Sequence, residues 1–243
     1  MSAPLLQVSD LSRRFGGLKA VEGLSLNVGA GEIVGLLGPN GSGKTTALNL
    51  ISGALKPDRG SVKLDGHETA GASNFKVARL GISRTYQLVR LFKTLTVLEN
   101  VVAGMSFTHG RHFGAAANDA AMALLGRVGL ADRATQRAEE LTYIDQKRLE
   151  LARCLASRPR VLLLDEWLAG LNPTELLQAI ELVRSLKNDG VSILMVEHVL
   201  EAVRSLCDHC VVMNAGQRIA SGTASAVLAD PEVVRAYLGD DDA

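Results

Sequence analysis

A glycine-rich stretch at residues 38–46 carries the clearest chemistry in this chain. It has the pattern G-x-x-x-x-G-K-[S/T], and its members are Gly38, Pro39, Asn40, Gly41, Ser42, Gly43, Lys44, Thr45 and Thr46. Glycines let successive backbone N–H groups curl around a phosphate chain, because no Cβ atom stands in the way. The pattern places the Lys44 ammonium near the β- and γ-phosphates and the Thr45 hydroxyl on Mg²⁺. A nucleoside triphosphate bound with Mg²⁺ is therefore the first ligand to expect.

The segments on either side of this stretch have the secondary structure that such a loop needs. Residues 32–37 form an apolar run typical of a buried strand, and residues 47–51 continue as a helix. A glycine-rich turn that contains Lys and Thr by chance would not require a strand before it and a helix after it. The setting favours a phosphate-binding loop.

Two further strands are expected to end on side chains that can do chemistry. The apolar run 161–166 ends with Asp165 and Glu166, and the next predicted strand, 191–196, is followed by Glu197 and His198. Asp165 is suited to hold Mg²⁺, directly or through water, and Glu166 to polarise an attacking water. Two solvated acids and a structural histidine are the alternative. Beside a triphosphate site we favour the catalytic interpretation, with His198 contacting the γ-phosphate.

Two residues are ambiguous from the sequence alone. Phe15 lies between the half-buried strands 5–8 and 24–28, where it could pack in the core or offer a flat face to a purine. The residues alone favour core packing. Gln87 ends a predicted strand over 82–87, at a sheet edge where ligands bind, although a solvated loop residue fits equally well.

The remaining pattern predicts an α/β fold in one domain over residues 1–243. Helices and strands alternate after residue 156, which indicates a parallel sheet with helical crossovers. Residues 1–92 and 156–243 form this core, together with a small antiparallel β subdomain that includes the strand 61–64. Residues 93–155 show helical patterns, including a loop marked by Gly110, His112 and Gly114, and are predicted to form an inserted helical subdomain.

Composition excludes several classes of function. Lys plus Arg and Asp plus Glu both total 26 among 243 residues, and aromatic residues make up 4%, so nucleic acid is not expected as a partner.

No apolar run approaches the roughly 18 residues that span a bilayer, and the first residues lack the basic start of a signal peptide. The chain is expected to stay in the cytosol. The cysteines, at 154, 207 and 210, are too few for a disulfide framework.

The segment Cys207-Asp208-His209-Cys210 resembles half of a metal site. No second pair of ligands stands at metal spacing, and the segment leads into a strand-like run. We therefore interpret these cysteines as small buried hydrophobic residues.

With these features in place, nearly the whole chain resembles the nucleotide-binding subunit of ATP-binding cassette (ABC) transporters. The resemblance implies the RecA-like P-loop NTPase fold, with ATP as the nucleotide. It implies that Phe15 stacks on adenine, which reverses the preference from the residues alone, and that Gln87 links Mg²⁺ and the γ-phosphate to the helical subdomain. It also implies that Glu166 is the catalytic base and His198 the switch histidine. The implied magnesium site comprises Thr45, Gln87 and Asp165.

Several short phrases resemble the ATPases of branched-chain amino acid importers. ATPases for urea, amides and other polar solutes share these phrases. One of them contains the loop AGLN, by which two subunits communicate, with Asn172 where the family usually has Asp. The phrases are RRFGGL at 13–18, RTYQ at 84–87, RLF at 90–92, LTVLENV at 95–101, AGLNP at 169–173 and AYLG at 236–239.

The family signature, Leu-Ser-Gly-Gly-Gln, is altered here. In the family its serine and backbone N–H groups meet the γ-phosphate that the partner subunit binds, and this chain has Thr142, Tyr143, Ile144 and Asp145 at the last four positions. Thr142 preserves a hydroxyl. The Ile144 side chain replaces a glycine that lets the backbone approach, and Asp145 is expected to place a carboxylate near an anionic phosphate. Trp167 is a second departure, since a proline usually follows the catalytic glutamate.

The resemblance implies an ATPase that energises import of a small polar solute, such as a branched-chain or related amino acid, through a separate membrane permease. The altered signature suggests a head-to-tail dimer with a different ABC ATPase subunit, peripheral on the inner face of the cell membrane. A solute-binding protein would be an indirect partner. The alternatives are a degenerate regulatory ATP-binding subunit and a non-transport ABC protein acting on DNA or ribosomes, which usually carries a coiled-coil insertion or a second cassette.

Overall fold

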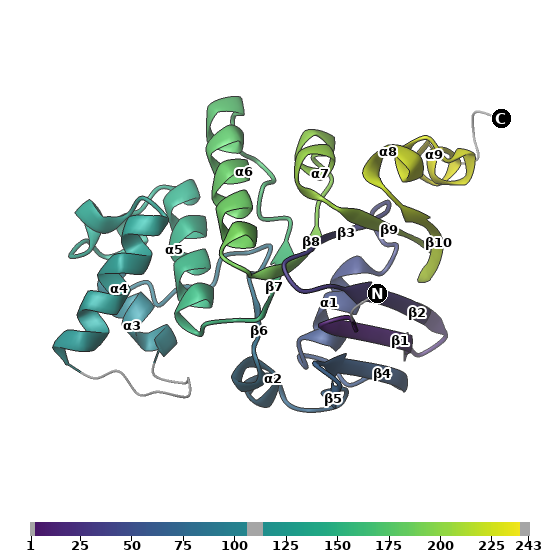
Figure 1. The fold of residues 1–243 in the computed structure, drawn as a ribbon, viewed down its shortest axis with the longest axis horizontal. Coiled ribbons are helices and arrows are strands. Elements are labelled where there is room, and N and C mark those ends of the chain that lie inside the picture. The colour runs from purple at the N-terminus through teal and green to yellow at the C-terminus, as the bar shows by residue number, and fades with distance from the viewer. Residues whose placement is uncertain (1–2, 106–113, 239–243) are drawn as a thin grey trace.

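The computed structural model describes residues 3–105 and 114–238. Its centre is a six-stranded sheet in which five strands are parallel, and only the edge strand β10 is antiparallel to its neighbour (Figure 1). The strands, in spatial order, are β10 (Gln217–Gly222), β9 (His209–Asn214), β3 (Ile33–Leu37), β8 (Ser192–Val196), β7 (Val161–Asp165) and β6 (Ile82–Arg84). The predicted parallel α/β sheet is confirmed.

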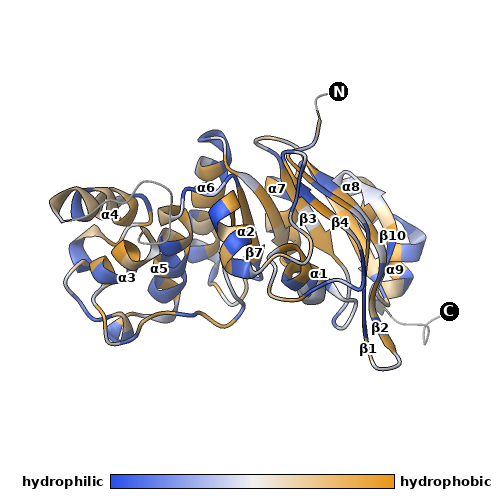
Figure 2. Ribbon diagram, turned by 90° about the horizontal axis from the view of Figure 1, so that it is seen from below, coloured by the Kyte–Doolittle hydropathy of each residue, from blue (hydrophilic) through white to orange (hydrophobic). Residues whose placement is uncertain are grey.

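A second, four-stranded sheet is antiparallel throughout, as the sequence predicted for the small β subdomain. Helix α1 (Lys44–Ile51) packs between the two sheets, and its buried leucines join one apolar core with strands from both. Figure 2 shows hydrophobic residues along the central strands and on α1. The strands of this sheet, in order, are β2 (Leu18–Val28), β1 (Leu6–Phe15), β4 (Arg59–Leu64) and β5 (His67–Glu68).

The other face of the central sheet is covered by α6 (Pro173–Asn188) and α7 (Leu200–Leu206). Beside them lies a group of three helices, α3 (Val97–Met105), α4 (Ala115–Arg127) and α5 (Tyr143–Ala156), at the far end of the molecule from the antiparallel sheet (Figure 1). A capping box starts α3, because the Thr96 hydroxyl accepts from the Glu99 N–H at 3.2 Å while the Glu99 carboxylate accepts from the Thr96 N–H at 2.7 Å. Gly110 and His112 lie outside the described residues.

Several elements differ from the sequence expectation. The strand predicted to end at Gln87 ends at Arg84, because the Tyr86 N–H turns away from the sheet to donate to the Glu150 carboxylate at 3.2 Å. The pattern also missed β5, β10 and the helices α2 (Asn74–Leu80), α8 (Ala224–Leu228) and α9 (Pro231–Leu238), together with the 3-10 turns Ala131–Arg133 and Ala138–Glu140.

Within the described part of the chain, no helix has the length and hydrophobicity needed to cross a bilayer. The same residues contain no cluster of three or more side chains suited to hold a metal ion. Cys210 is fully buried and Cys207 half-buried, and a hydrogen bond with Cys210, followed by burial, raises the pKa of the Cys207 thiol. These observations fit the interpretation of the CDHC segment as core packing.

Candidate functional site

The glycine-rich loop connects β3 to α1 at the carboxyl end of the central sheet. Its glycines are required by packing as well as by conformation. Gly38 and Gly43 have φ angles of 142° and 102°, and an added Cβ would lie 2.1 Å from the Met213 carbonyl oxygen or 2.2 Å from that of Ala20. Gly41, with φ of 80°, faces open space. Neighbouring backbone therefore fixes both ends of the loop and leaves its middle accessible.

Lys44 lies within the curl of this loop. Its side chain is 8% exposed, and its Nζ donates to the carbonyl oxygens of Gly38 at 2.7 Å and Pro39 at 2.8 Å. Burial lowers the pKa of Lys44, whereas the nearby carboxylates of Glu166 and Asp165 act in the opposite direction. An ammonium group held this way is a fixed positive charge suited to an anion.

Asp165 ends β7, where its carboxylate is nearly inaccessible to solvent. The Arg84 guanidinium donates to Oδ2 at 2.7 Å, and Oδ1 is buried with no hydrogen-bond partner among the described residues. A buried, unpaired carboxylate oxygen is costly, and a bound cation removes that cost. With the exposed Thr45 hydroxyl at the start of α1 and the Gln87 amide oxygen, Asp165 offers the oxygen ligands that Mg²⁺ prefers. The residues present therefore fit a magnesium ion.

Glu166 follows Asp165 and has an unusual backbone conformation. Its φ of 50° lies in the left-handed region, and its N–H donates to the Val196 carbonyl on β8 at 2.9 Å. The Gln87 side-chain amide donates to Glu166 Oε2 at 2.8 Å. Non-glycine residues in this conformation concentrate at functional sites, because the surrounding structure must enforce it. The Glu166 carboxylate is therefore a hydrogen-bond acceptor in direct contact with Gln87.

A cavity of about 430 Å³ is lined by Lys44, Gln87 and Glu166, whereas Asp165 is not among its lining residues. Phe15 stands at its wall with 44% of its surface exposed and the Arg13 guanidinium 5.2 Å from the ring centre, so the core-packing interpretation of Phe15 is wrong. His198 is exposed just after β8 and is not among the lining residues. The predicted residues that do line the cavity are Phe15, Asn40, Gly41, Gly43, Lys44, Thr45, Thr46, Gln87 and Glu166.

The altered signature begins α5 and is arranged differently from the expectation. Thr142 caps the helix, and the Asp145 carboxylate accepts from the Thr142 hydroxyl at 2.7 Å. Arg133 at 2.7 Å and Arg148 at 3.3 Å form ion pairs with the same carboxylate, which is buried. Asp145 therefore faces inward and is neutralised, which corrects the expectation that it places a charge near phosphate. Tyr143 is 53% exposed.

Sequence reasoning missed a buried lysine beside the segment that follows β7. Lys147 Nζ donates to the carbonyl oxygens of Ala169 at 2.7 Å and Trp167 at 3.1 Å. The backbone carbonyl of Lys147 in turn accepts from the Trp167 indole N–H at 3.2 Å. Burial lowers the pKa of Lys147. This reciprocal pair joins α5 to the segment after Glu166 and explains how the chain accommodates Trp167, which is fully buried. The one signal in the sequence is that Lys147, a charged residue, occupies a position on the buried face of helix α5.

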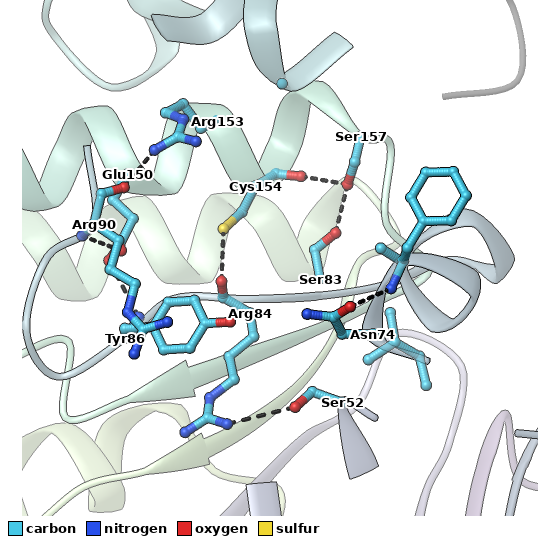
Figure 3. Close-up of a pocket in the computed structure, with 14 residues that line it drawn as sticks. Ser52, Asn74, Ser83, Arg84, Tyr86, Arg90, Glu150, Arg153, Cys154 and Ser157 are labelled. Carbon is cyan, nitrogen blue, oxygen red and sulfur yellow. Dashed lines mark hydrogen bonds between the residues drawn. The ribbon is translucent and has the colours of Figure 1, made fainter. Parts of the chain in front are cut away.

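A second cavity, of about 480 Å³, lies between α5, β6 and α2 (Figure 3). Glu150 lies beside it, and its carboxylate accepts from the Arg90 N–H at 2.9 Å as well as from Tyr86. Burial raises the pKa of Glu150 to about 7. Phe75, Tyr86, Arg90 and Arg153 also line the cavity, and the Arg90 guanidinium lies 4.0 Å from the Tyr86 ring centre. This cavity thus combines aromatic and cationic groups.

Comparison with known proteins agrees with this geometry. The family described as ABC transporter matches residues 21–169, and the family described as branched-chain amino acid ATP-binding cassette transporter matches residues 217–243. The chain is 42% identical to the high-affinity branched-chain amino acid transport ATP-binding protein BraF of Pseudomonas aeruginosa, over 99% of this chain and 100% of BraF.

Solved structures give the same result. The ADP conformation of MJ1267, an ATP-binding cassette of an ABC transporter, matches with a TM-score of 0.89 and 31% identity over 98% of this chain and 100% of that one. The dimeric structure of MJ0796, a bacterial ABC transporter cassette, matches with a TM-score of 0.81 and 25% identity over 90% and 98% of the two chains. The chain therefore belongs to the ABC transporter family, as one of its ATP-hydrolysing cassettes.

Proposed function

We propose that this chain hydrolyses ATP to energise import of a small polar solute, a branched-chain or related amino acid, through a separate membrane permease. The observation that carries the proposal is the meeting of Lys44, Glu166 and Gln87 at one cavity, with the unpaired Asp165 oxygen at the end of the same strand as Glu166. The likeness to BraF and the match at residues 217–243 support the choice of solute.

The arrangement of these residues suggests how hydrolysis would proceed. Lys44, now bonded to two loop carbonyls, would exchange them for phosphate oxygens. Mg²⁺, held by Thr45, Asp165 and Gln87, would neutralise charge on the phosphates. Glu166 would accept a proton from the attacking water, and the γ-phosphoryl group would transfer to that water, releasing ADP and phosphate.

The Gln87–Glu166 hydrogen bond would be a resting arrangement. While the Gln87 amide occupies Oε2, this carboxylate oxygen is unavailable to a water molecule. Gln87 lies on the segment that leads from β6 to the helical group, so movement of that group could release the carboxylate. Closure of the site would then be coupled to readiness for catalysis. His198 would contact the γ-phosphate after such a closure.

We further propose a head-to-tail pair with a second ABC ATPase subunit of different sequence. Thr142, Tyr143 and Ile144 would complete the partner's nucleotide site. Because Asp145 is turned inward, the asymmetry of the pair would come from the larger side chains of Tyr143 and Ile144, which stand where the family has glycines. The dimeric form of the related MJ0796 cassette supports pairing as such.

The second cavity would receive the permease. The rings of Phe75 and Tyr86 and the arginines at 90 and 153, which line it, suit a helix end that presents apolar and acidic groups (Figure 3). Binding there would hold the chain peripherally on the inner face of the membrane. A solute-binding protein would contact only the permease, and nucleic acid has no role in this proposal.

The test is reconstitution. The chain, the ATPase and the permeases encoded beside it would be assembled in vesicles, and uptake of labelled leucine or a urea control would be measured with ATP inside or outside. Uptake that requires ATP on the ATPase face supports the proposal. Robust hydrolysis by a homodimer of this chain would refute the asymmetric pair, and absence of single-turnover hydrolysis in the heterodimer would favour a regulatory subunit instead.

A further inference from the structure

The C-terminal segment contacts the phosphate loop at both of its ends. The Gly38 N–H, at the start of the loop, donates to the Tyr237 hydroxyl of α9 at 2.8 Å, across 199 positions of sequence. The Ser42 carbonyl, near the end of the loop, accepts from the Gly216 N–H at 3.0 Å. Gly216 forms the turn between β9 and β10, and its own carbonyl accepts from the Glu22 N–H at 2.8 Å.

The packing around these two contacts leaves little freedom. An added Cβ at Gly38 would lie 2.1 Å from the Met213 carbonyl oxygen, and one at Gly216 would lie 2.7 Å from the carbonyl oxygen of Lys19. The loop, the β9–β10 turn and the start of β2 therefore meet backbone to backbone. Movement at one of these three segments must displace the others.

Tyr237 makes its hydrogen bond to the phosphate loop from a position that is 42% exposed. Burial of its hydroxyl raises the pKa of Tyr237, so the phenol remains neutral at physiological pH and accepts the Gly38 N–H. Helix α9 is anchored by Val233, which is buried in a core shared with β9 and α8. The acceptor is thus held by a fixed element.

We infer that the β9–β10 turn and α9 hold the phosphate loop in the conformation that binds nucleotide, with Tyr237 as a positioning residue that does not itself touch substrate. The inference rests on the proposed role of residues 38–46 in holding the triphosphate. Without the hydroxyl, the Gly38 N–H loses its acceptor and the loop populates other conformations. The apparent affinity for nucleotide then falls in proportion to the fraction of molecules whose loop remains in the binding conformation.

The experiment compares the full-length chain with its Tyr237→Phe variant. We expect ATP and ADP to bind about threefold to tenfold more weakly, the factor that corresponds to one ordinary hydrogen bond. The kcat at saturating ATP, measured on the complex with the partner ATPase, should stay within about twofold, because no catalytic group moves. Hydrogen exchange of the Gly38 amide, followed by NMR, should accelerate. The control is Val234→Ala, an exposed position on the same helix, which should change none of these quantities.

A second variant tests the other contact without altering Tyr237. Gly216→Ala introduces a Cβ that conflicts with the Lys19 carbonyl and displaces the N–H that reaches Ser42. It should also weaken nucleotide binding. Unchanged affinity in both variants would overturn the inference, as would a loss of kcat with unchanged affinity in Tyr237→Phe.

Lys44→Ala separates this inference from the proposed function. If Lys44→Ala loses nucleotide binding while Tyr237→Phe and Gly216→Ala both bind as tightly as the unmodified chain, only the role of the C-terminal segment is wrong. If Lys44→Ala itself still binds ATP tightly, the proposed phosphate site is wrong, and the inference falls with it.

Discussion

Replacing Glu197 by Gln should stabilise the protein near pH 8 and have little effect near pH 5. The Glu197 side chain is 2% exposed, its Oε1 accepts from the Leu168 N–H at 2.7 Å, and its Oε2 has no partner among the described residues. Burial, opposed in part by the Leu168 hydrogen bond and by Lys147, raises the pKa of this carboxyl from 4.5 to about 7. Gln keeps an oxygen for Leu168 and carries no charge.

The magnitude and sign follow from linkage between protonation and folding. Because the folded pKa lies above the unfolded one, the folded protein holds this proton more tightly, and the contribution of the group to stability is greatest below pH 4.5. That contribution declines as the pH rises and is lost above about pH 7. A difference of roughly 2.5 pKa units corresponds to about 3 kcal/mol. Gln at this position avoids the loss.

The assay is urea unfolding of both proteins at pH 5, 6, 7 and 8. The gap between the two free energies of unfolding should widen from pH 5 to pH 7 and level off towards pH 8. Glu201→Gln, on the exposed surface of α7, is the matched control and should give a small difference that does not change across this range. Parallel curves for Glu197→Gln and the unmodified protein, or a variant that is less stable at pH 8, would refute the reasoning.

Three other substitutions test the site and its supports. Glu166→Gln should retain ATP binding in a filter assay but reduce phosphate release at least about 100-fold; undiminished release would remove Glu166 as the base. Lys147→Met should lower the free energy of unfolding in urea by about 1–3 kcal/mol, because the carbonyls of Trp167 and Ala169 lose their donor, and Lys147→Arg should recover part of it. Asp145→Asn should cost about 1 kcal/mol, and an unchanged unfolding midpoint would show that its ion pairs contribute nothing.

Local patterns made much of the fold and the nucleotide site predictable from sequence. The phosphate loop is one continuous segment, and the strand before it, its turn and the helix after it are each determined by residues that are adjacent in the sequence. The same holds for Asp165 and Glu166, which end an unbroken apolar run. The carboxyl ends of parallel strands meet at one edge of the sheet, so the sequence predicted that groups from several strands would gather there. Gln87 and Glu166 line one cavity with Lys44, whereas Asp165 and His198 are not among its lining residues.

Features that depend on distant contacts could not be predicted in this way. The orientation of Asp145 depends on Arg133, which precedes it by 12 residues in a short turn that the pattern missed. The Tyr237 contact with Gly38 has no local signal at all. The β10 strand, with mixed exposure and few β-favouring residues, gave no alternation to recognise. Phe15 was ambiguous because an aromatic ring suits a core and a ligand equally.

The exchange of hydrogen bonds between Lys147 and Trp167 has a consequence for engineering. Substituting a family's most common residue is a usual route to a more stable protein. Here that change would be Trp167→Pro, which removes both the buried indole and the donor to the Lys147 carbonyl. By analogy with truncations of buried tryptophan, the loss would be about 3–5 kcal/mol. At this position the consensus would be the damaging choice, and position 147 would have to be redesigned together with it.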